Sequence, residues 1–285
     1  MAHYLFIVLV LGYSCFFFAD LLIRKYSVSE NSFLFIAKRS AFTSILALLW
    51  LYFSDAIIIN PNFSQSIQII GCSFLCGLGL FFFVLANKSL PFPNVITINL
   101  FGLILQELIA YFFLREQLKG SFIPAITISV FGLLLMASMP KSRIGLFYSI
   151  LSTCFWAVGY ALLSIPLKST RIEWVTLMME LTILALCLLI LILNQSISFK
   201  DIALKSGLKT KNIIYPIIAI VTILGSLLMN YAYQHFKVAE ISFFYISLYP
   251  MAILFSRLYF KEKLSKIDWI SNTLLISGIA FYLIY

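Results

Sequence analysis

The chain has 285 residues, of which 62% are hydrophobic and only 11% are charged, and its formal net charge at pH 7 is +9. This composition excludes a soluble globular protein, because such proteins have about a quarter of their residues charged. We expect the excess Lys and Arg at helix ends and in loops, where they anchor a protein in the membrane, and we expect no nucleic-acid partner.

Ten apolar segments follow one another along the chain, each close to the roughly 20 residues that cross a bilayer as a helix. The expected spans are Tyr4–Ile23, Ser32–Phe53, Ile67–Ala86, Val95–Leu114, Phe122–Met139, Ile144–Ile165, Trp174–Asn194, Ile213–Tyr233, Ile241–Phe260 and Trp269–Ile284. Short connectors rich in Pro, Asn, Ser and charged residues separate them. We therefore predict an all-α integral membrane protein with ten transmembrane helices.

The first segment is expected to be a membrane span. No Lys or Arg precedes it, and its apolar run is longer than the core of a cleavable signal peptide. The five cysteines lie inside apolar segments. Cys72 and Cys76 are four residues apart on one helix face, but no His or carboxylate joins them, so we predict neither a metal site nor a cofactor.

The chain carries an internal repeat. Five identities occur at a spacing of 146 residues: Gly79 and Gly225, Ala86 and Ala232, Glu116 and Glu262, Leu118 and Leu264, and Gly132 and Gly278. The predicted repeats are residues 1–140 and 141–285, with five spans each. Because five is odd, the second copy must enter the bilayer the opposite way up. Inverted repeats are typical of secondary transporters, whose solute site lies near the midplane where the repeats meet.

Short motifs occupy matching places in the two halves. Leu114-Arg115-Glu116-Gln117-Leu118 follows the fourth span, Lys261-Glu262-Lys263-Leu264 follows the ninth, and Cys154-Phe155-Trp156-Ala157 lies in the sixth. These motifs resemble the Gly-Glu-Arg-Leu-like turn and the Trp-Gly region of EamA repeats in the drug/metabolite transporter superfamily. The turns differ from the family pattern at Arg115 and Lys261, which stand where the family has Gly.

The resemblance implies ten helices arranged as two inverted five-helix repeats. It also implies a transporter, but it names no substrate, because the superfamily carries amino acids, sugars, nucleotide derivatives and drugs. Glu116 and Glu262 are expected to have a structural role and to fix the turns after the fourth and ninth spans together with neighbouring basic residues. The Lys and Arg count in the loops favours both termini outside, whereas the habit of the family places them inside.

Polar residues at membrane depth are candidates for function because burying them is costly. Asn99, Gly102 and Gln106 follow an i, i+3, i+7 spacing that forms one face of the fourth span, with Glu107 beside it. This face is predicted to line a cavity in which Glu107 binds a cationic group or a proton. The alternative is that Glu107 is a protonated partner in helix–helix hydrogen bonds or is paired with a basic residue.

Glu180 and Arg39 occupy matching positions of the seventh and second spans, 141 residues apart. We predict that they act as gates or contact the solute. The alternative is that Lys38 and Arg39 reach toward the interface or pair with Asp20.

Aromatic and amide side chains complete the predicted solute site. They are Trp156, Tyr160, Asn230, Tyr245 and Tyr249. Rings and amides around a midplane cavity suit organic metabolites, through cation–π contacts and hydrogen bonds. Tyr and Trp also form ordinary belts at the two membrane interfaces, which is the alternative reading of these residues.

No catalytic constellation accompanies these residues. The two histidines, His3 and His235, lie at the ends of different spans, and no metalloprotease, nucleophile-elbow or phosphate-binding motif occurs. We therefore predict a secondary transporter rather than an enzyme, in a bacterial inner (plasma) membrane, whose partners are a small organic solute, membrane lipids and, through Glu107, protons. The alternative function is a non-transporting membrane scaffold or lipid-binding protein.

Overall fold

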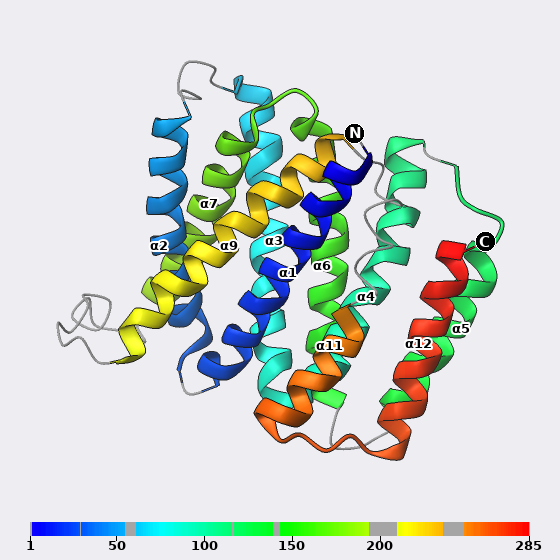
Figure 1. Cartoon of the computed structure of the whole chain (residues 1–285). Helices are drawn as coiled ribbons and strands as arrows, with labels where there is room; N and C mark the ends of the chain where they lie inside the picture. The colour runs from blue at the N-terminus through cyan, green and yellow to red at the C-terminus, as the bar shows by residue number, and fades with distance from the viewer. Residues whose placement is uncertain are drawn as a thin grey trace. The chain divides into compact units, whose positions relative to one another are not determined.

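The computed structural model describes residues 2–28, 30–54, 61–115, 117–138, 143–193, 210–235 and 248–284, and most of these residues are helical (Figure 1). Seven helices in these ranges are long and apolar enough to cross a membrane, and Phe122–Ala137 is a shorter apolar helix. The prediction of an all-α, multi-pass membrane protein is confirmed.

The predicted spans overlap the observed helices. The α-helices are α1 (Ala2–Ser27), α2 (Ser32–Phe53), α3 (Phe63–Ser89), α4 (Phe92–Ile109), α5 (Phe122–Ala137), α6 (Arg143–Leu167), α7 (Ile172–Leu193), α9 (Thr210–His235), α11 (Leu248–Phe255) and α12 (Lys266–Ile284). Two π-helical segments, η2 (Ala110–Leu114) and η4 (Ser256–Phe260), extend α4 and α11. That all ten segments cross the membrane stays a prediction.

Side-chain caps explain where several helices begin. The Asn31 side chain accepts hydrogen bonds from the backbone amides of Phe33 and Leu34 at the start of α2. Before α12, Asp268 accepts from the Ser265 amide while Ser265 Oγ accepts from the Asp268 amide. This reciprocal pattern is a capping box, which satisfies amides that the first turn of a helix leaves without partners.

The chain forms two compact units. Unit 1 comprises Met1–Gly77 and Leu163–His235, and unit 2 comprises Leu78–Leu162 and Phe236–Tyr285. Each unit combines segments from both halves of the chain, and α3 and α6 have residues in both units. The predicted repeats, 1–140 and 141–285, are defined by sequence and stay a prediction.

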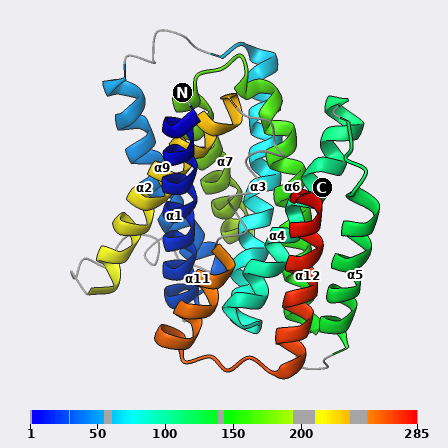
Figure 2. The same ribbon diagram turned by 45° about the vertical axis from the view of Figure 1, so that its right-hand side comes forward.

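In unit 1, α1 packs against α9 and α2 packs against α7 (Figures 1 and 2). Glycines allow the first pair to approach closely, because a Cβ atom on Gly12 would lie 3.0 Å from Met229 Sδ, and one on Gly225 would lie 3.3 Å from Cys15 Cβ. Between α2, α7 and α9, an apolar cluster is formed by Ala47, Leu51, Leu177, Ile223 and Leu227.

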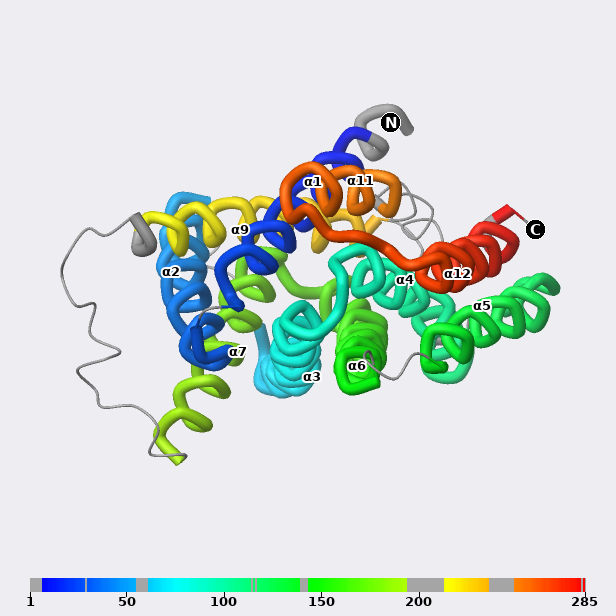
Figure 3. The backbone as a smooth tube through the Cα atoms, turned by 90° about the horizontal axis from the view of Figure 1, so that it is seen from below, coloured from blue at the N-terminus to red at the C-terminus, as the bar shows by residue number. Residues whose placement is uncertain are grey.

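In unit 2, α5 and α12 run side by side, as Figures 1 and 3 show. Two glycines, 146 residues apart, make this packing reciprocal. A Cβ atom on Gly132 would lie 2.8 Å from the Ser271 carbonyl oxygen, and one on Gly278 would lie 2.7 Å from the Ala125 carbonyl oxygen. Ser271 and Ala125 are also 146 residues apart, so each helix offers the other the same surface.

The two π-helical segments end in the same way. Arg115 follows η2 with φ 57°, and Lys261 follows η4 with φ 54°, and both lie in the left-handed region. Glycine reaches this region without the steric penalty that a Cβ atom brings, which is why it is favoured just after a helix. The conformation explains why the family turn that these motifs resemble has Gly at this position.

Candidate functional site

The predicted polar face of α4 is buried in unit 2. Asn99 and Gln106 are each 7% exposed. Gly102 lies between them on the same face, and a Cβ atom there would be 3.1 Å from Thr153 Cγ2 on α6. The absence of a side chain at Gly102 therefore lets α6 bring Thr153 against the polar face of α4.

Asn99 has an unused hydrogen-bonding atom. Thr153 Oγ1 lies 2.9 Å from Asn99 Oδ1 and 2.8 Å from the Ser149 carbonyl oxygen, and no group in the described part of the chain bonds Asn99 Nδ2. A hydroxyl has one proton to donate. If it goes to Ser149, the Asn99 amide can turn to donate to Thr153, and its oxygen is then the atom without a partner. In either orientation one polar atom of the amide is free to bind another group.

The other polar residues of this face are Gln106 and Glu107. Gln106 Oε1 is buried and receives no hydrogen bond from the described residues, and Glu107 is 3% exposed. A buried polar group left without a hydrogen bond costs roughly 1–3 kcal/mol. Membrane helices tolerate such groups mainly where they serve a function, so this face of α4 is the best candidate for a binding surface in unit 2.

Trp156 and Tyr160 lie one turn apart on α6, on the side of the helix that also carries Thr153. The Trp156 indole rests on Gly79, where a Cβ atom would lie 2.5 Å from Trp156 Cδ1, and its ring centroid is 5.1 Å from that of Phe83. Both Trp156 and Tyr160 are partly exposed. They give unit 2 an aromatic surface beside the polar face of α4.

Tyr249 belongs to a second buried polar group in unit 2. It is 8% exposed on α11 and lies near Thr97 of α4 and Asn272 of α12. Asn94 Nδ2 donates to Asp268 Oδ1 at 2.6 Å, and Asn272 Nδ2 donates to Asn94 Oδ1 at 2.7 Å.

Sequence reasoning did not identify the Asn94, Asp268 and Asn272 network. Two signals pointed to part of it: the capping pattern places Asp268 in the first turn of α12, and the spacing of four residues puts Asn272 on the same face. Contact with Asn94, 174 residues away from Asp268, had no sequence signal.

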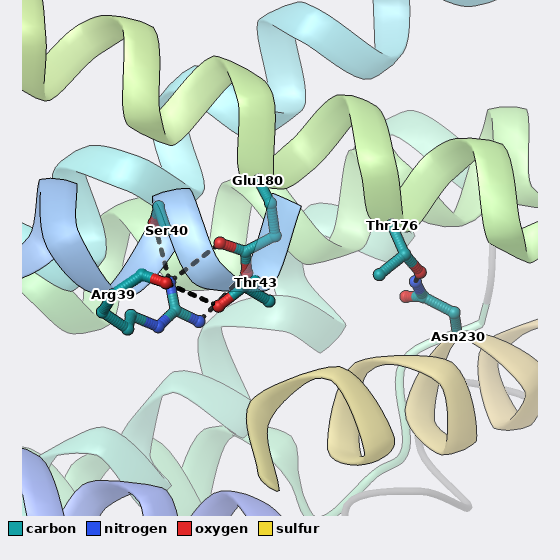
Figure 4. Close-up of polar contacts among 6 residues, drawn as sticks. All are labelled: Arg39, Ser40, Thr43, Thr176, Glu180 and Asn230. Atoms are coloured by element: carbon teal, nitrogen blue, oxygen red, sulfur yellow. Dashed lines mark hydrogen bonds and ion pairs between the residues drawn. The ribbon is translucent and has the colours of Figure 1, made fainter. Parts of the chain in front are cut away.

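In unit 1, Arg39 of α2 binds Glu180 of α7 (Figure 4). Nη1 donates to Glu180 Oε2 and Nη2 donates to Glu180 Oε1, both at 3.0 Å, and Nη1 also lies 3.2 Å from Ser40 Oγ. The side chains of Arg39 and Glu180 are 6% and 0% exposed. The two-pronged geometry is the strong form of an ion pair and offsets the large penalty of burying both charges.

This arrangement corrects one alternative considered for the basic residues of α2. Arg39 forms its ion pair with Glu180 rather than with Asp20, and Lys38 forms its own with Glu30. That Glu180 contacts the solute stays a prediction; in the structure its carboxylate is held by Arg39.

Asn230 lies in unit 1, on α9. Its Nδ2 donates to Thr176 Oγ1 of α7 at 2.9 Å, about one turn along α7 from Glu180 (Figure 4). Tyr245 lies outside the described residues. The predicted set is thus divided: Asn99, Gln106, Glu107, Trp156, Tyr160 and Tyr249 are in unit 2, and Glu180 and Asn230 are in unit 1.

Glu262 fixes the turn after η4 through a backbone amide and a serine hydroxyl, and a role of neighbouring basic residues in this turn stays a prediction. Glu262 Oε2 accepts hydrogen bonds from the Phe92 amide at 2.9 Å and from Ser256 Oγ at 2.7 Å, so it joins the turn after η4 to the first residue of α4. Its counterpart Glu116 lies outside the described part of the chain.

Comparison with known proteins identifies the family. The model of the EamA-like transporter family matches residues 143–284. A solved structure titled "Crystal structure of protein" has a TM-score of 0.64 and 15% sequence identity, over 96% of this chain and 95% of the other; at this identity the likeness concerns the fold alone. No curated protein matches the chain. The chain is a multi-pass membrane transporter that belongs to the EamA-like transporter family of the drug/metabolite transporter superfamily.

Proposed function

We propose that this protein is a secondary transporter that moves small organic solutes across a bacterial inner membrane by alternating access. The solute classes are amino acids, nucleotide-type compounds and drug-like compounds. The proposed architecture is ten transmembrane helices in two inverted repeats of five, as in transporters whose halves rock around a midplane site.

Three relationships support the repeat. Gly132 and Gly278 pack reciprocally between α5 and α12 at a spacing of 146 residues. Arg115 and Lys261, at the same spacing, adopt the same left-handed conformation. In addition, Arg39 and Glu180, which are bound to each other, occupy matching positions of the second and seventh spans. Contacts between equivalent positions are what a two-fold relationship between repeats produces.

The observation that carries the proposed solute site is the unsatisfied polar face of α4. One atom of the Asn99 amide and the Gln106 carbonyl oxygen are buried without hydrogen-bond partners among the residues that the structure describes. A solute with hydrogen-bond donors and acceptors would satisfy both, and the Trp156 ring nearby would contact its apolar part. We propose that Glu107, Tyr160 and Tyr249 in unit 2 also serve the solute, as do Glu180, Asn230 and Tyr245.

The alternative is a non-transporting scaffold or lipid-binding protein. Such a protein would gain stability if its unsatisfied polar side chains became apolar, and it would lose nothing in function. The polar face of α4 favours the transporter for this reason.

Thermal unfolding of the detergent-purified protein against a panel of solutes tests the proposal. A solute at 100 times its dissociation constant should stabilise the folded state by about 2.7 kcal/mol. We expect one chemical class to raise the melting temperature, and we expect Asn99→Ala and Trp156→Ala to remove the shift. Phe147→Ala is the matched control, because Phe147 is also on α6 but is 59% exposed.

Counterflow of the same solute into liposomes then separates transport from binding. Uptake by the wild type and by Phe147→Ala, but not by Asn99→Ala, supports the transporter. Binding without uptake would favour the non-transporting alternative.

A further inference from the structure

Unit 2 contains a buried polar network where α11 and α12 both pack against α4. Asn94 Nδ2 donates to Asp268 Oδ1 at 2.6 Å, and Asn272 Nδ2 donates to Asn94 Oδ1 at 2.7 Å. Asn94 and Asn272 are 0% exposed, and Asp268 is 7% exposed. The polar atoms of the network therefore need partners inside the protein.

The carboxylate of Asp268 fixes the direction of both amides. An ionised carboxylate only accepts hydrogen bonds, so Asn94 must present its NH₂ group to Asp268. The Asn94 oxygen then faces Asn272, which must present its own NH₂ group in turn. The Asn272 oxygen is left at the end of this series, and it is buried without a hydrogen bond from the described residues. Turning over either amide would place two like atoms against each other, so the network cannot satisfy this oxygen by itself.

A second oxygen without a partner belongs to Tyr249 of α11. This residue is 8% exposed, its hydroxyl lies near the side chains of Asn272 and Thr97, and none of the described residues forms a well-aligned hydrogen bond with it. The Thr97 hydroxyl donates its only proton to the Pro93 carbonyl oxygen at 2.7 Å, so its lone pairs remain available. Three helices thus bring together oxygen atoms that can still bind another group.

The network also carries a negative charge that no basic side chain balances. Asp268 accepts hydrogen bonds from Asn94 and from the amide and hydroxyl of Ser265, which are all neutral groups. It takes part in none of the ion pairs formed by the described residues. The N-terminus of α12 contributes only about half an elementary charge. A buried carboxylate is costly unless a positive charge accompanies it.

The packing of α12 does not require these polar side chains. At the spacing of 146 residues, Asp268 and Asn272 match Phe122 and Ile126 of α5. The two helices pack against each other reciprocally, although one has apolar and the other has polar residues at these positions. The polar pair is therefore particular to α12 and its contact with α4, and is not a part of the helix packing that the two segments share.

We propose that the free oxygens of Asn272, Tyr249 and Thr97, together with the charge of Asp268, form a binding site for a small monovalent cation, Na⁺. One positive charge balances the one carboxylate, and neutral oxygens are ligands that hard cations accept. Ca²⁺ takes six to eight oxygen ligands, several of them carboxylates, and the described residues hold no group of three or more His, Cys, Asp or Glu side chains placed to bind a metal. Na⁺ suits a site with few protein oxygens better than K⁺, because the smaller ion takes fewer ligands.

A cation at this place would join α11 and α12 to α4. It would therefore favour the arrangement of unit 2 in which these three helices are in contact, because a ligand shifts an equilibrium toward the state that binds it better. As a coupling ion for the solute, Na⁺ rests on the proposed transport function. The binding of Na⁺ itself can be measured without any solute.

Thermal unfolding of the full-length protein in detergent tests the site, in NaCl, KCl or N-methyl-D-glucamine chloride at equal ionic strength. We expect Na⁺ to raise the melting temperature in a saturable way, and we expect the shift to be lost in Asp268→Asn, which removes the charge but keeps the shape. Thr273→Val is the matched control, because Thr273 is exposed on α12 and bonds only to its own helix. Equal melting temperatures in NaCl and KCl, or an undiminished shift in Asp268→Asn, would overturn the proposal.

Binding of radioactive Na⁺ covers the case in which Asp268→Asn does not fold. Tyr249→Phe removes one oxygen and keeps the ring, so it should bind Na⁺ several-fold more weakly than the wild type, and unchanged affinity would overturn the site. Na⁺ binding together with a solute panel and counterflow without response would support the site and contradict the proposed transport. A response to solute without Na⁺ binding would do the reverse.

Discussion

Arg39 and Glu180 are bound to each other across 141 residues of sequence, and 141 is also the spacing that aligns the second span with the seventh. Two residues at equivalent positions of a two-fold repeat can meet only close to its axis. The ion pair therefore marks where the axis of the proposed repeat would pass through unit 1, between α2 and α7.

Arg39→Gln should destabilise the protein strongly, because it leaves Glu180 buried without its cation. Removing one partner of a buried ion pair costs about 3–5 kcal/mol, whereas replacing both is often nearly neutral. We expect the double variant Arg39→Gln, Glu180→Gln to recover most of the loss in chemical unfolding in detergent. A double variant as unstable as the single one would show that the loss does not come from an unpaired Glu180 charge, and that the ion pair itself stabilises the fold.

Gly278→Ala should destabilise the packing of α5 and α12. The added Cβ would lie 2.2 Å from Ser129 Oγ and 2.7 Å from the Ala125 carbonyl oxygen, and the backbone cannot easily withdraw. Overpacking of this kind costs typically about 1–3 kcal/mol. Gly71→Ala is the control: a Cβ on Gly71 meets nothing within 4 Å, and Ala favours a helix over Gly by about 1 kcal/mol. Unfolding curves in which the two variants lose equal stability would contradict the packing described for α12.

Lys261→Gly should stabilise the protein although it removes a side chain. The left-handed conformation costs a residue with a Cβ atom about 1–2 kcal/mol, and Gly removes this cost. Gly also increases the conformational entropy of the unfolded chain, which lowers the free energy of unfolding by roughly 0.4–1 kcal/mol. We expect a net gain of between about 0 and 1.6 kcal/mol in the free energy of unfolding. Lys263→Gly, at a position without positive φ, should give no gain; equal gains at both positions would mean that backbone strain is not the cause.

Gln106→Met should raise stability and abolish solute binding at once. The change replaces a buried carbonyl oxygen that lacks a hydrogen bond with an apolar side chain of similar length, which removes a penalty of roughly 1–3 kcal/mol. A higher melting temperature without solute, together with the loss of the further rise that solute causes, would show that Gln106 serves binding rather than stability. Leu134→Met, an exposed position on α5 that is 63% accessible, should change neither quantity. Solute shifts that survive in Gln106→Met would remove this residue from the site.

The sequence predicted the helices well because long apolar runs in a membrane protein leave few other structures open to the backbone. The span expected at Ser32–Phe53 coincides with α2, and Asn99, Gly102 and Gln106 all lie on α4, as expected from their place in the fourth span. Helix ends differed where caps or prolines act locally, as at α4, which begins three residues before the expected Val95.

Contacts between distant helices were the part that sequence could not supply. The spacing of 141 residues indicated that Arg39 and Glu180 occupy matching positions. Only the structure shows that they form a direct ion pair rather than two separate gates. Likewise, the hydrogen bonds from Asn230 to Thr176 and from Asn94 to Asp268 depend on which helices are neighbours, and the polarity of either residue alone does not determine that.

The turns after η2 and η4 show that a left-handed backbone conformation can form without the glycine that favours it. Neither Arg115 nor Lys261 is a glycine, yet both complete the same widened helical turn and the same left-handed reversal. A conformational signature of this kind does not depend on side-chain identity. It can therefore reveal common ancestry between segments whose residues have diverged too far to be aligned by sequence.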